Sequence, residues 1–371
     1  MTSLRTVLVV GAGAAGAAAA TLLAAGGVEV DVVEREPEVG LHGAGITLQG
    51  NALRVLRELG VWDQVRKLGY AFDSLALRTP DGRLIVEMDD LRTGGDDLPA
   101  TLGMQRPDFA RVLVDRAREA GAAVRTGITV AELDQDDHGA DVRFSDGSAG
   151  RYDLVIGADG IRSATRQQIG TYLDPQPTGM GIWRVTASRP EGLDRTELIY
   201  GGPCYIAGYC PTSPDTVYAY LVEAAQDRSG LTAEQRLEVV HDLAAGYGGY
   251  WDHIREHMTD PNYTWFEAHV VERPWHKGRV VLIGDAAHSC PPTLAQGAAQ
   301  ALEDASVLAE LLLAADEVDE ELWQRFGDRR FERAKTVVDA SVQVGRWLLD
   351  GERGDVPGLM GRIATMVREP A

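Results

Sequence analysis

The stretch that organises this chain is Gly278–Ala305, which reads GRVVLIGDAAHSCPPTLAQGAAQALEDA. Val280 to Ile283 is a short apolar run typical of a buried parallel strand, and the Gly-Asp pair after it places Asp285 at the carboxyl end of that strand. The prolines keep the next residues out of helix, and an apolar pattern with helical spacing begins at Gly297. The free N–H groups at the start of this helix would stabilise negative charge on a molecule held in the loop.

A similar arrangement lies at the amino end of the chain. Thr6–Val10 is an apolar run, Gly11–Gly16 reads GAGAAG, and the strand that follows a small-residue helix ends at Glu34. The first glycine suits a tight turn, the second lets the backbone approach a pyrophosphate, and the third lets the helix pack closely on the sheet, while Glu34 suits a ribose diol. Arg35 either faces the adenosine and phosphates or is a solvated charge. The residues expected to contact a dinucleotide are Gly11, Gly13, Ala14, Ala15, Gly16, Glu34 and Arg35.

A third strand ends in the same way. The run from Asp153 to Gly157 predicts another buried strand, and Asp159 follows it. We therefore predict that three strand ends, at Gly11, Asp159 and Asp285, converge on one extended ligand.

These three patterns, in this order, resemble the cofactor fingerprints of class A FAD-dependent monooxygenases, the p-hydroxybenzoate hydroxylase-like family, in its short two-domain type. The resemblance implies that Asp285 binds the ribityl chain of FAD and that Pro292 and Gly297 lie against the isoalloxazine ring. Pro292 and Gly297 thereby become candidate catalytic residues, with Ala298 beside them in the cofactor site. One departure is Ala295, where the family usually has the first glycine of a Gly-Gln-Gly.

The resemblance also implies roles outside these motifs. The glycine-rich loop with Gly45 and Ile46 would contact the flavin ring through its backbone, and Ile128 would contact adenine. Arg106 would reach the phosphate and ribityl region, where a guanidinium fork suits phosphate; the alternative is a surface arginine at a helix start. Asp159 would help to hold the ribose and pyrophosphate.

His42 is the candidate catalytic base. The hydroxynicotinate hydroxylase type carries a histidine where this chain has Thr47, so His42 is the histidine left in this loop for such a role. The alternative is a solvated loop histidine.

Aromatic residues gather between Pro175 and Val271 in alternating strands. On the strand period of two, Tyr205 shares a face with Tyr209, and Tyr218 shares a face with Tyr220. The segment resembles the antiparallel substrate sheet of the family, where aromatic rings offer a planar ligand a stacking surface; the alternative is ordinary sheet core. The candidate substrate-binding residues are Trp183, Tyr205, Tyr218 and Pro292.

We predict an α/β fold: a Rossmann-like FAD-binding domain with a parallel sheet, plus an antiparallel-sheet substrate domain and C-terminal helices. The expected FAD-binding domain comprises residues 1–71, 100–172 and 272–330, the substrate domain residues 72–99 and 173–271, and the C-terminal helical segment residues 331–371. Two of the expected helices are Asp319–Ala340 and Ser341–Leu349. The charged residues of Asp328–Arg333 are interpreted as surface or interdomain pairs.

Composition excludes several classes of function. A formal charge of -20 and a pI near 4.8 argue against nucleic acid or an anionic membrane as partner. Three cysteines without zinc spacing favour a reducing compartment, and we expect no metal site. The chain runs almost directly from Met1 into a strand, which leaves no room for a signal peptide. We expect a cytoplasmic monomer or homodimer.

The resemblance implies a reaction. NADPH or NADH, visiting transiently because the one dinucleotide fingerprint is taken by FAD, reduces the flavin; O2 then adds at C4a, and the hydroperoxide hydroxylates an aromatic or heteroaromatic substrate. One alternative is a tailoring or antibiotic-inactivating monooxygenase that acts on a fused-ring polyketide. A non-enzyme alternative is an FAD-binding sensor.

Overall fold

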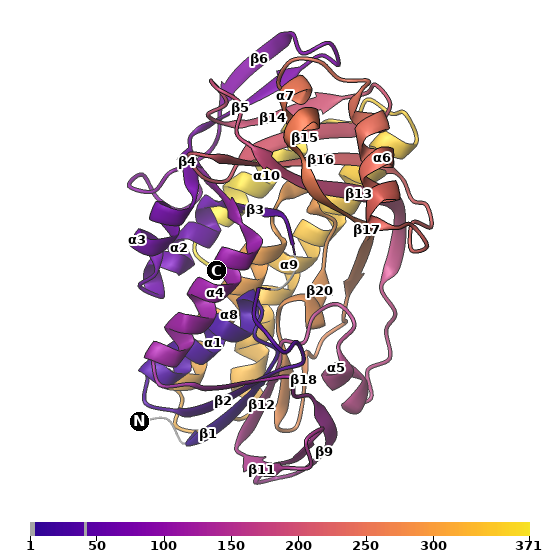
Figure 1. Ribbon diagram of the computed structural model, residues 1–371. Coiled ribbons are helices and arrows are strands. Elements are labelled where there is room, and N and C mark those ends of the chain that lie inside the picture. Colours follow the sequence, from indigo (N-terminus) through magenta and orange to yellow (C-terminus); the bar gives the residue numbers. More distant parts are fainter. Residues whose placement is uncertain (1–3, 41–42) are drawn as a thin grey trace.

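The sheet that contains the amino-terminal strand has six strands, in the order β18-β19-β12-β1-β2-β8 (Figure 1). The computed structural model describes residues 4–40 and 43–371. All neighbouring strands are parallel except β18 and β19, and the three apolar runs predicted as buried strands are confirmed. The bounds are β1 Thr6–Val10, β2 Glu29–Glu34, β8 Ala123–Thr126, β12 Leu154–Gly157, β18 His276–Lys277 and β19 Val280–Leu282.

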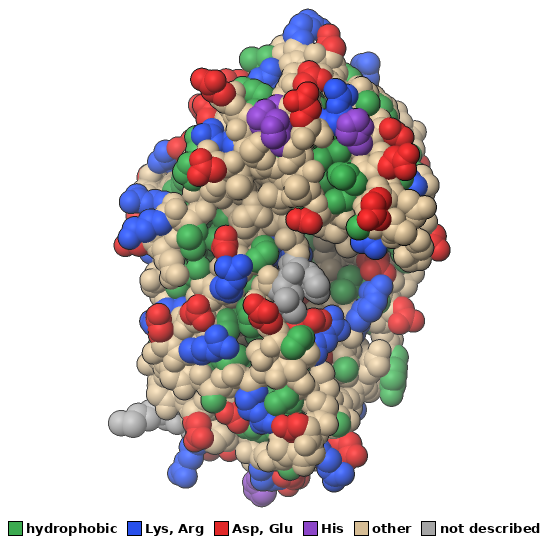
Figure 2. Space-filling view, in the orientation of Figure 1, with side chains coloured by type: hydrophobic (Ala, Val, Ile, Leu, Met, Phe, Trp, Pro, Cys, Tyr) green, Lys and Arg blue, Asp and Glu red, His purple; other side chains and the backbone are tan. Residues whose placement is uncertain are grey.

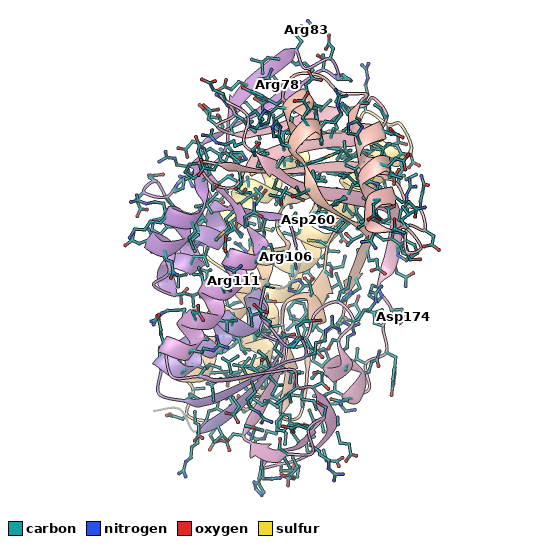
Figure 3. The ribbon with its side chains drawn as sticks, in the orientation of Figure 1. Arg78, Arg83, Arg106, Arg111, Asp174 and Asp260 are labelled. Atoms are coloured by element: carbon teal, nitrogen blue, oxygen red, sulfur yellow. The ribbon has the colours of Figure 1, made fainter. Side chains whose placement is uncertain are left out.

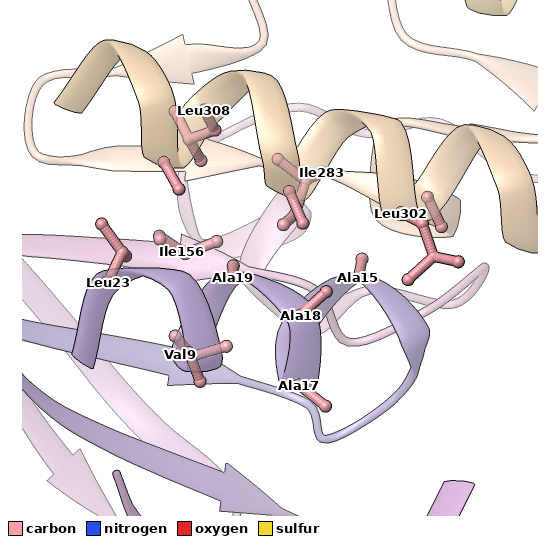
Figure 4. Close-up of a cluster of buried hydrophobic side chains, with 14 of the residues drawn as sticks. Val9, Ala15, Ala17, Ala18, Ala19, Leu23, Ile156, Ile283, Leu302 and Leu308 are labelled. Carbon is pink, nitrogen blue, oxygen red and sulfur yellow. The ribbon is translucent and has the colours of Figure 1, made fainter. Parts of the chain in front are cut away.

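Two small-residue helices pack on this sheet and on each other. Leu302 and Leu308 of α8 (Gly297–Ala314) belong to the same buried cluster as the alanine side chains of α1 (Ala14–Ala25), which Figure 4 shows. Gly284, which follows β19, has φ +58°, and a Cβ added there would lie 2.9 Å from a side-chain carbon of α1. Small residues therefore allow the loop after β19 to approach the first helix closely.

A second sheet of eight strands lies above the first in Figure 1, in the order β20-β17-β13-β16-β15-β14-β5-β6. The predicted hairpin around residues 80–82 belongs to this sheet, as expected, because β6 pairs with β5 and β5 pairs with β14. One face packs on α6 (Ala233–Ala244) and α7 (Tyr250–His257), where Trp183 and Trp251 are fully buried. The bounds are β5 Ser74–Arg78, β6 Leu84–Asp89, β13 Gln176–Ser188, β14 Thr196–Tyr200, β15 Ile206–Pro211, β16 Thr216–Ala224, β17 Thr259–Val270 and β20 His288–Ser289.

Two three-stranded sheets complete the strand content of the described ranges, in the orders β3-β7-β4 and β11-β10-β9. The first of these lies between the large sheets, since β3 contacts both α8 and β16. The bounds of these strands and of the remaining helices are β3 Gly45–Gln49, β4 Tyr70–Phe72, β7 Thr101–Gln105, β9 Val130–Asp136, β10 Gly139–Phe144, β11 Ala149–Tyr152, α2 Gly50–Glu58, α3 Trp62–Leu68, α4 Arg106–Glu119 and α5 Ala164–Gln168.

The C-terminal helices differ from the prediction. α9 is a single helix of 30 residues, Glu320–Leu349, so the predicted break between Ala340 and Ser341 is wrong. Ser341 does not end the helix, because its hydroxyl donates to the carbonyl oxygen of Val337, one turn back, at 2.7 Å. The domain boundary drawn at residue 331 falls inside α9, and the domain division stays a prediction. The last helix, α10 (Val356–Arg368), packs on α9.

Candidate active site

The carboxyl ends of β1, β12 and β19 lie side by side, because these strands are neighbours in the parallel sheet. A Cβ added to Gly11 would lie 3.0 Å from the Cα of Asp159, and one added to Gly284 would lie 2.9 Å from the Cβ of Ala15. The glycine-rich loop, the Asp159 loop and the Asp285 loop therefore meet at one edge of the sheet. The three strand ends thus lie together as predicted, and their contact with one extended ligand stays a prediction.

The glycines of the first loop have different surroundings. Gly11 has φ +102°, and a Cβ there would lie 2.4 Å from a backbone oxygen of the neighbouring loop. A Cβ on Gly16 would lie 1.9 Å from the carbonyl oxygen of Gly11, whereas one on Gly13 would meet nothing within 4 Å. The first turn of α1, which begins with Ala14 and Ala15, has no acidic residue, and its N-cap makes no side-chain hydrogen bond. Its N–H groups and the open space beside Gly13 are therefore available to an anion such as a pyrophosphate.

Glu34, Ile128 and Arg35 lie near the end of β2. The Glu34 carboxylate accepts hydrogen bonds from the N–H groups of Ala12 at 2.8 Å and Glu36 at 3.0 Å, so it is fixed beside the glycine-rich loop with lone pairs left for a diol. Ile128 donates its N–H to the Glu34 carbonyl oxygen at 2.9 Å. The Arg35 side chain is 68% exposed and lies 3.5 Å from the Glu36 carboxylate. It is therefore a solvated surface charge.

Asp159 uses its carboxylate within its own loop. It accepts hydrogen bonds from the N–H and the hydroxyl of Thr165, both at 2.9 Å, and from the hydroxyl of Ser163. Behind this loop the buried Arg166 donates to the carbonyl oxygen of Ala286 at 2.9 Å, which ties the loop to the Gly-Asp segment. Asp159 thus holds the turn after β12, and its direct contact with FAD stays a prediction.

Asp285 lies in a short 3-10 turn, η1 (Gly284–Ala286), with its side chain accessible to water. Neighbouring protein atoms nevertheless displace part of the water around the carboxyl, and this desolvation raises its pKa above the ordinary value, although His288 and Arg106 oppose the shift. Arg106 is exposed at the start of α4 and makes no ion pair with any carboxylate of the described residues. It lies near the middle of the molecule, between the two large sheets (Figure 3). Arg106 is therefore an unpaired cation that acts on Asp285, and its contact with phosphate or ribityl oxygens stays a prediction.

The strand β3 brings Gly45 and Ile46 to the same region, because it pairs with β7 and β7 leads directly into Arg106. A Cβ added to Gly45 would lie 2.3 Å from the Cβ of Tyr218. Glycine at this position therefore allows the cofactor side of the molecule to touch the second sheet. His42 lies outside the described residues, and its candidate role stays a prediction.

The segment after Asp285 forms a second 3-10 turn, η2 (Pro292–Leu294), before α8 begins at Gly297. Ala295 has φ +52° and ψ +31°, in the left-handed region that glycine adopts without strain. The first turn of α8 has no acidic residue and no side-chain cap, so the N–H groups that begin with Gly297 and Ala298 are free to stabilise negative charge.

A buried ionic cluster beneath the Gly-Asp turn was missed by sequence reasoning. The Asp304 carboxylate accepts hydrogen bonds from Gly284 N–H at 2.8 Å and Arg330 Nε at 2.7 Å, and it lies 2.7 Å from His288 Nε2. Arg330 also donates to Glu303 at 3.0 Å. Burial alone would raise the pKa of Asp304, but His288 and Arg330 bring it down to about 2. The ionised carboxylate therefore holds the start of the turn that carries Asp285 and the side chain of His288 just after it.

The interpretation of Asp328–Arg333 as surface or interdomain charges is wrong for Arg330, whose exposed fraction is 0%. Arg333 donates to the same glutamate of α8 at 2.8 Å and is largely buried as well. The available signal was helical spacing, since Arg330 lies one turn from the buried Phe326 and one turn from the buried Ala334.

Tyr218 and Tyr220 lie on one face of the second sheet, with ring centroids 5.3 Å apart, which confirms that they share a face. Tyr205 packs in a cluster with Ile206, whereas Tyr209 is buried on the opposite face of the sheet under α7. The predicted shared face of Tyr205 and Tyr209 is therefore wrong, because β15 begins at Ile206 and the strand alternation does not extend to Tyr205.

The structure does not bring Trp183 to this site. Its side chain is 0% exposed on the face covered by α6 and α7, and its Nε1 donates to the Glu223 carboxylate at 2.9 Å. The strand alternation turns the next residue, Arg184, toward the opposite face, where the two tyrosines lie.

Charged side chains of both signs are spread over the face of the molecule seen in Figure 2, which is hollowed between its upper and lower parts. Within residues 4–40 and 43–371, no group of three His, Cys, Asp or Glu side chains is arranged to hold a metal ion. No helix in those ranges combines the length and the apolar character that crossing a membrane requires.

The residues at the sheet edge fit an adenine–flavin dinucleotide. The open cradle at Gly13 and the free end of α1 suit a pyrophosphate, and the carboxylate of Glu34 suits a ribose. Arg106, Asp285 and the free end of α8 follow at the side nearer the second sheet. Adenine and flavin portions would thus be held by separate sets of groups along one edge.

Comparisons with known proteins agree with this fit. The profile of the family described as FAD binding domain matches residues 5–341. YetM of Bacillus subtilis (strain 168) is 31% identical over 99% of this chain and 100% of its own length. The 2-heptyl-3-hydroxy-4(1H)-quinolone synthase of Pseudomonas aeruginosa (strain PAO1) is 32% identical over 92% of this chain and 90% of its own length.

Among solved structures, Klebsiella pneumoniae HpxO complexed with FAD and uric acid superposes with a TM-score of 0.84, at 22% identity, over 99% of this chain and 94% of that chain. That likeness supports the fold. The family profile spans most of the chain, and two relatives exceed 30% identity over nearly all of it. The chain belongs to the FAD binding domain family, among the class A FAD-dependent monooxygenases.

Proposed function

We propose that this FAD-dependent monooxygenase is a single-component hydroxylase that transfers one oxygen atom of O2 to an aromatic or heteroaromatic ring, with NADPH or NADH as the electron donor. The observation that supports this most directly is the contact between Gly45, on the cofactor side, and Tyr218, on the aromatic face of the second sheet. This contact places a surface suited to a planar ligand next to the groups suited to the flavin.

We assign the cofactor-binding roles as follows. The first turn of α1 and the cradle at Gly13 hold the pyrophosphate, Glu34 holds the adenosine ribose, and the backbone at Ile128 faces adenine. Arg106 and Asp285 hold the ribityl and phosphate region. The Arg35 side chain lies in solvent, so it contributes to FAD binding at most through long-range electrostatic attraction.

The groups around the reacting ring come from two loops and one helix. When bound, FAD supplies the chemistry of O2 activation, and the residues of this chain orient the substrate, exclude water and stabilise charge. The free N–H groups at Gly297 and Ala298 stabilise negative charge on the nearby ring system. Pro292 limits the space on one side of the flavin ring, and the strand at Gly45 and Ile46 limits it on the other.

The substrate rests on the face of the second sheet that carries Tyr218 and Tyr220. Tyr205 lies in the cluster at the end of this face, near Ile206, and contributes to the shape of the pocket there. Trp183, which points the other way, supports the sheet from behind.

The test is substrate-stimulated oxygen consumption by the FAD-loaded protein. NADPH or NADH oxidation and O2 uptake are measured across a panel of phenols, hydroxybenzoates and hydroxylated nitrogen heterocycles, and products are examined for one added oxygen atom derived from labelled O2. Stimulation together with a hydroxylated product supports the proposal. A flavin-loaded protein that no panel member stimulates with either donor contradicts it.

A matched pair of variants tests the cofactor assignment. Asp285→Asn is expected to weaken FAD binding at least about tenfold, because a charged acceptor facing ribityl hydroxyls is replaced by a neutral amide. Asp115→Asn, on the exposed side of α4 where Asp115 pairs with Arg118, is expected to leave FAD affinity unchanged. Equal FAD affinities for the two variants would remove Asp285 from the site.

The cellular setting is part of the proposal. The three cysteines are free thiols, with Cys204 and Cys210 buried, which suits a reducing cytoplasm. We propose a monomer or homodimer there, and light scattering on the FAD-loaded protein measures which of the two is present.

A further inference from the structure

A chain of side-chain amides links the end of β3 to the first turn of α8. The residues are Gln49, Asn51, Gln296 and Gln300, and the last three have exposed fractions of 0–1%. Asn51 Nδ2 donates to Gln296 Oε1 at 3.0 Å, and Gln296 Nε2 donates back to Asn51 Oδ1 at 3.2 Å. Gln296 Nε2 also donates to Gln49 Oε1, at the carboxyl end of β3. These amides therefore join two segments that we assign to the flavin ring.

The amide network continues into the buried ionic cluster. Asn51 Nδ2 also donates to Glu303 Oε1 at 3.1 Å, so the start of α2 is tied to the middle of α8. Gln300 Nε2 donates to Gln296 Oε1 at 3.2 Å, and Gln300 Oε1 accepts from Arg330 at 2.8 Å. Side-chain hydrogen bonds therefore connect the first turn of α8 to β3, α2 and α9 at once.

Gln296 occupies the position immediately before α8, yet its side chain does not cap the helix. A side chain at that position commonly accepts a hydrogen bond from a backbone N–H group of the first turn. A glutamine amide has two donor hydrogens and two acceptor lone pairs. Asn51 and Gln49 accept the two hydrogens, and Asn51 and Gln300 donate to the two lone pairs. The amide therefore has no acceptor left for the first turn of α8, and the N–H groups there stay available to a ligand.

We propose that Gln296 is a positioning residue for the FAD site: the amide network holds the first turn of α8 against β3 and keeps its N–H groups uncapped, so that these groups stabilise the negative charge of reduced FAD. This inference rests on the proposed function and adds a residue that sets the reduction potential of the flavin. The stabilisation by a helix end falls off within one turn, so the position of that turn decides its strength. A fully satisfied buried network fixes this position, because a change at one amide leaves its partners unpaired away from water.

The experiment measures the reduction potential of FAD bound to the protein, by anaerobic equilibration with a dye of known potential. The dissociation constants of oxidised and reduced FAD are measured in parallel. Gln296→Met keeps the length of the side chain and removes every hydrogen bond of the amide. The variant is expected to weaken the binding of reduced FAD about tenfold more than that of oxidised FAD, which makes the two-electron potential about 30 mV more negative.

Two further variants make the comparison specific. Gln49→Met removes only the bond between β3 and Gln296, and it should shift the potential in the same direction by about half as much. Gln235→Met is the matched control: Gln235 Oε1 accepts from the Thr232 N–H at 3.0 Å in the capping box of α6, which covers the face of the second sheet that carries Trp183. Loss of this cap should lower the melting temperature slightly and leave the potential unchanged.

The outcomes separate this inference from the proposed function. An unchanged potential in Gln296→Met, or an equal shift in Gln235→Met, overturns the positioning role, and a hydroxylated product from the wild-type protein then leaves the hydroxylase proposal standing. If Gln296→Met does not fold, Gln49→Met decides, and an unchanged potential there overturns the role. The measurement uses no O2, substrate or nicotinamide donor, so the expected shift without any hydroxylated product supports the positioning role and counts against the proposed reaction.

Discussion

Replacement of Arg330 by methionine should destabilise the protein far more than the same change at its neighbour. The Arg330 guanidinium has an exposed fraction of 0% and lies 2.7 Å from Asp304 and 3.0 Å from Glu303, which are themselves 0% and 2% exposed. Arg330→Met removes a positive charge from two buried carboxylates, whose desolvation is then less well compensated. Breaking a buried ion pair by removing one partner costs about 3–5 kcal/mol in unfolding free energy.

The expected fall in melting temperature follows from the size of the chain. An unfolding entropy of about 2.1 cal/mol/K per residue gives roughly 0.8 kcal/mol/K for the whole chain, so the variant should melt about 4–6 °C lower. Thermal unfolding of the FAD-free protein, followed by circular dichroism, measures the shift. Urea unfolding of the same samples measures the change in free energy independently.

Arg329→Met is the matched control. Arg329 pairs with Glu310 at 2.9 Å on the surface, with side chains 32% and 61% exposed, and such pairs contribute about 0–1 kcal/mol. Its melting temperature should therefore fall by no more than about 1 °C. If both variants lost the same small amount of stability, the buried cluster would not be a structural requirement, and the argument from burial would be refuted.

Three further predictions concern the site and its surroundings. Ala295→Gly should stabilise the protein by about 0.5–1 kcal/mol in urea unfolding, because the left-handed conformation at φ +52° strains a residue with a Cβ; a destabilised variant would contradict this. His269 is buried and its pKa is lowered to about 4, so the unfolded chain takes up the proton first and stability should fall by about 3 kcal/mol as the pH drops from 6.5 to 4; His269→Gln should remove that part of the pH dependence in parallel urea titrations. Gly13→Ala should weaken FAD binding and leave the melting temperature of the FAD-free protein unchanged, since its Cβ meets only open space, whereas Gly16→Ala should lower that melting temperature because its Cβ would lie 1.9 Å from a carbonyl oxygen; the opposite pattern would contradict both assignments.

The elements that we assign to the cofactor could be predicted because local rules determine them. A short apolar run such as Val280–Leu282 is stable in a sheet covered on both faces, and the turn at Gly11 needs a φ that glycine adopts without strain. The acidic residues at the strand ends, Glu34 and Asp285, could be placed at one edge because neighbouring parallel strands end together.

Helical spacing could have placed Arg330 on the buried side of α9, but the partners of Arg330 in the buried cluster could not be predicted. Glu303 and Asp304 lie on an apolar helix and Arg330 on a charged one, and their meeting depends on how α8 packs against α9. Trp183 shows a related limit, since its role depends on which face of a strand turns toward the cofactor, and alternation alone leaves both choices open.

The arginines of the buried cluster carry more positive charge than its carboxylates carry negative charge. The end of α10 provides the missing negative charge. Three guanidinium groups, those of Arg54, Arg330 and Arg333, surround the two carboxylates of α8. Arg54 and Arg333 also bind carbonyl oxygens at the end of α10, at 2.9 Å for Arg368 and 2.7 Å for Met366. The negative pole of that helix acts as a counter-ion. Lengthening α10 by further helical turns would engage these oxygens in its own hydrogen bonds and leave the one excess positive charge of the cluster uncompensated.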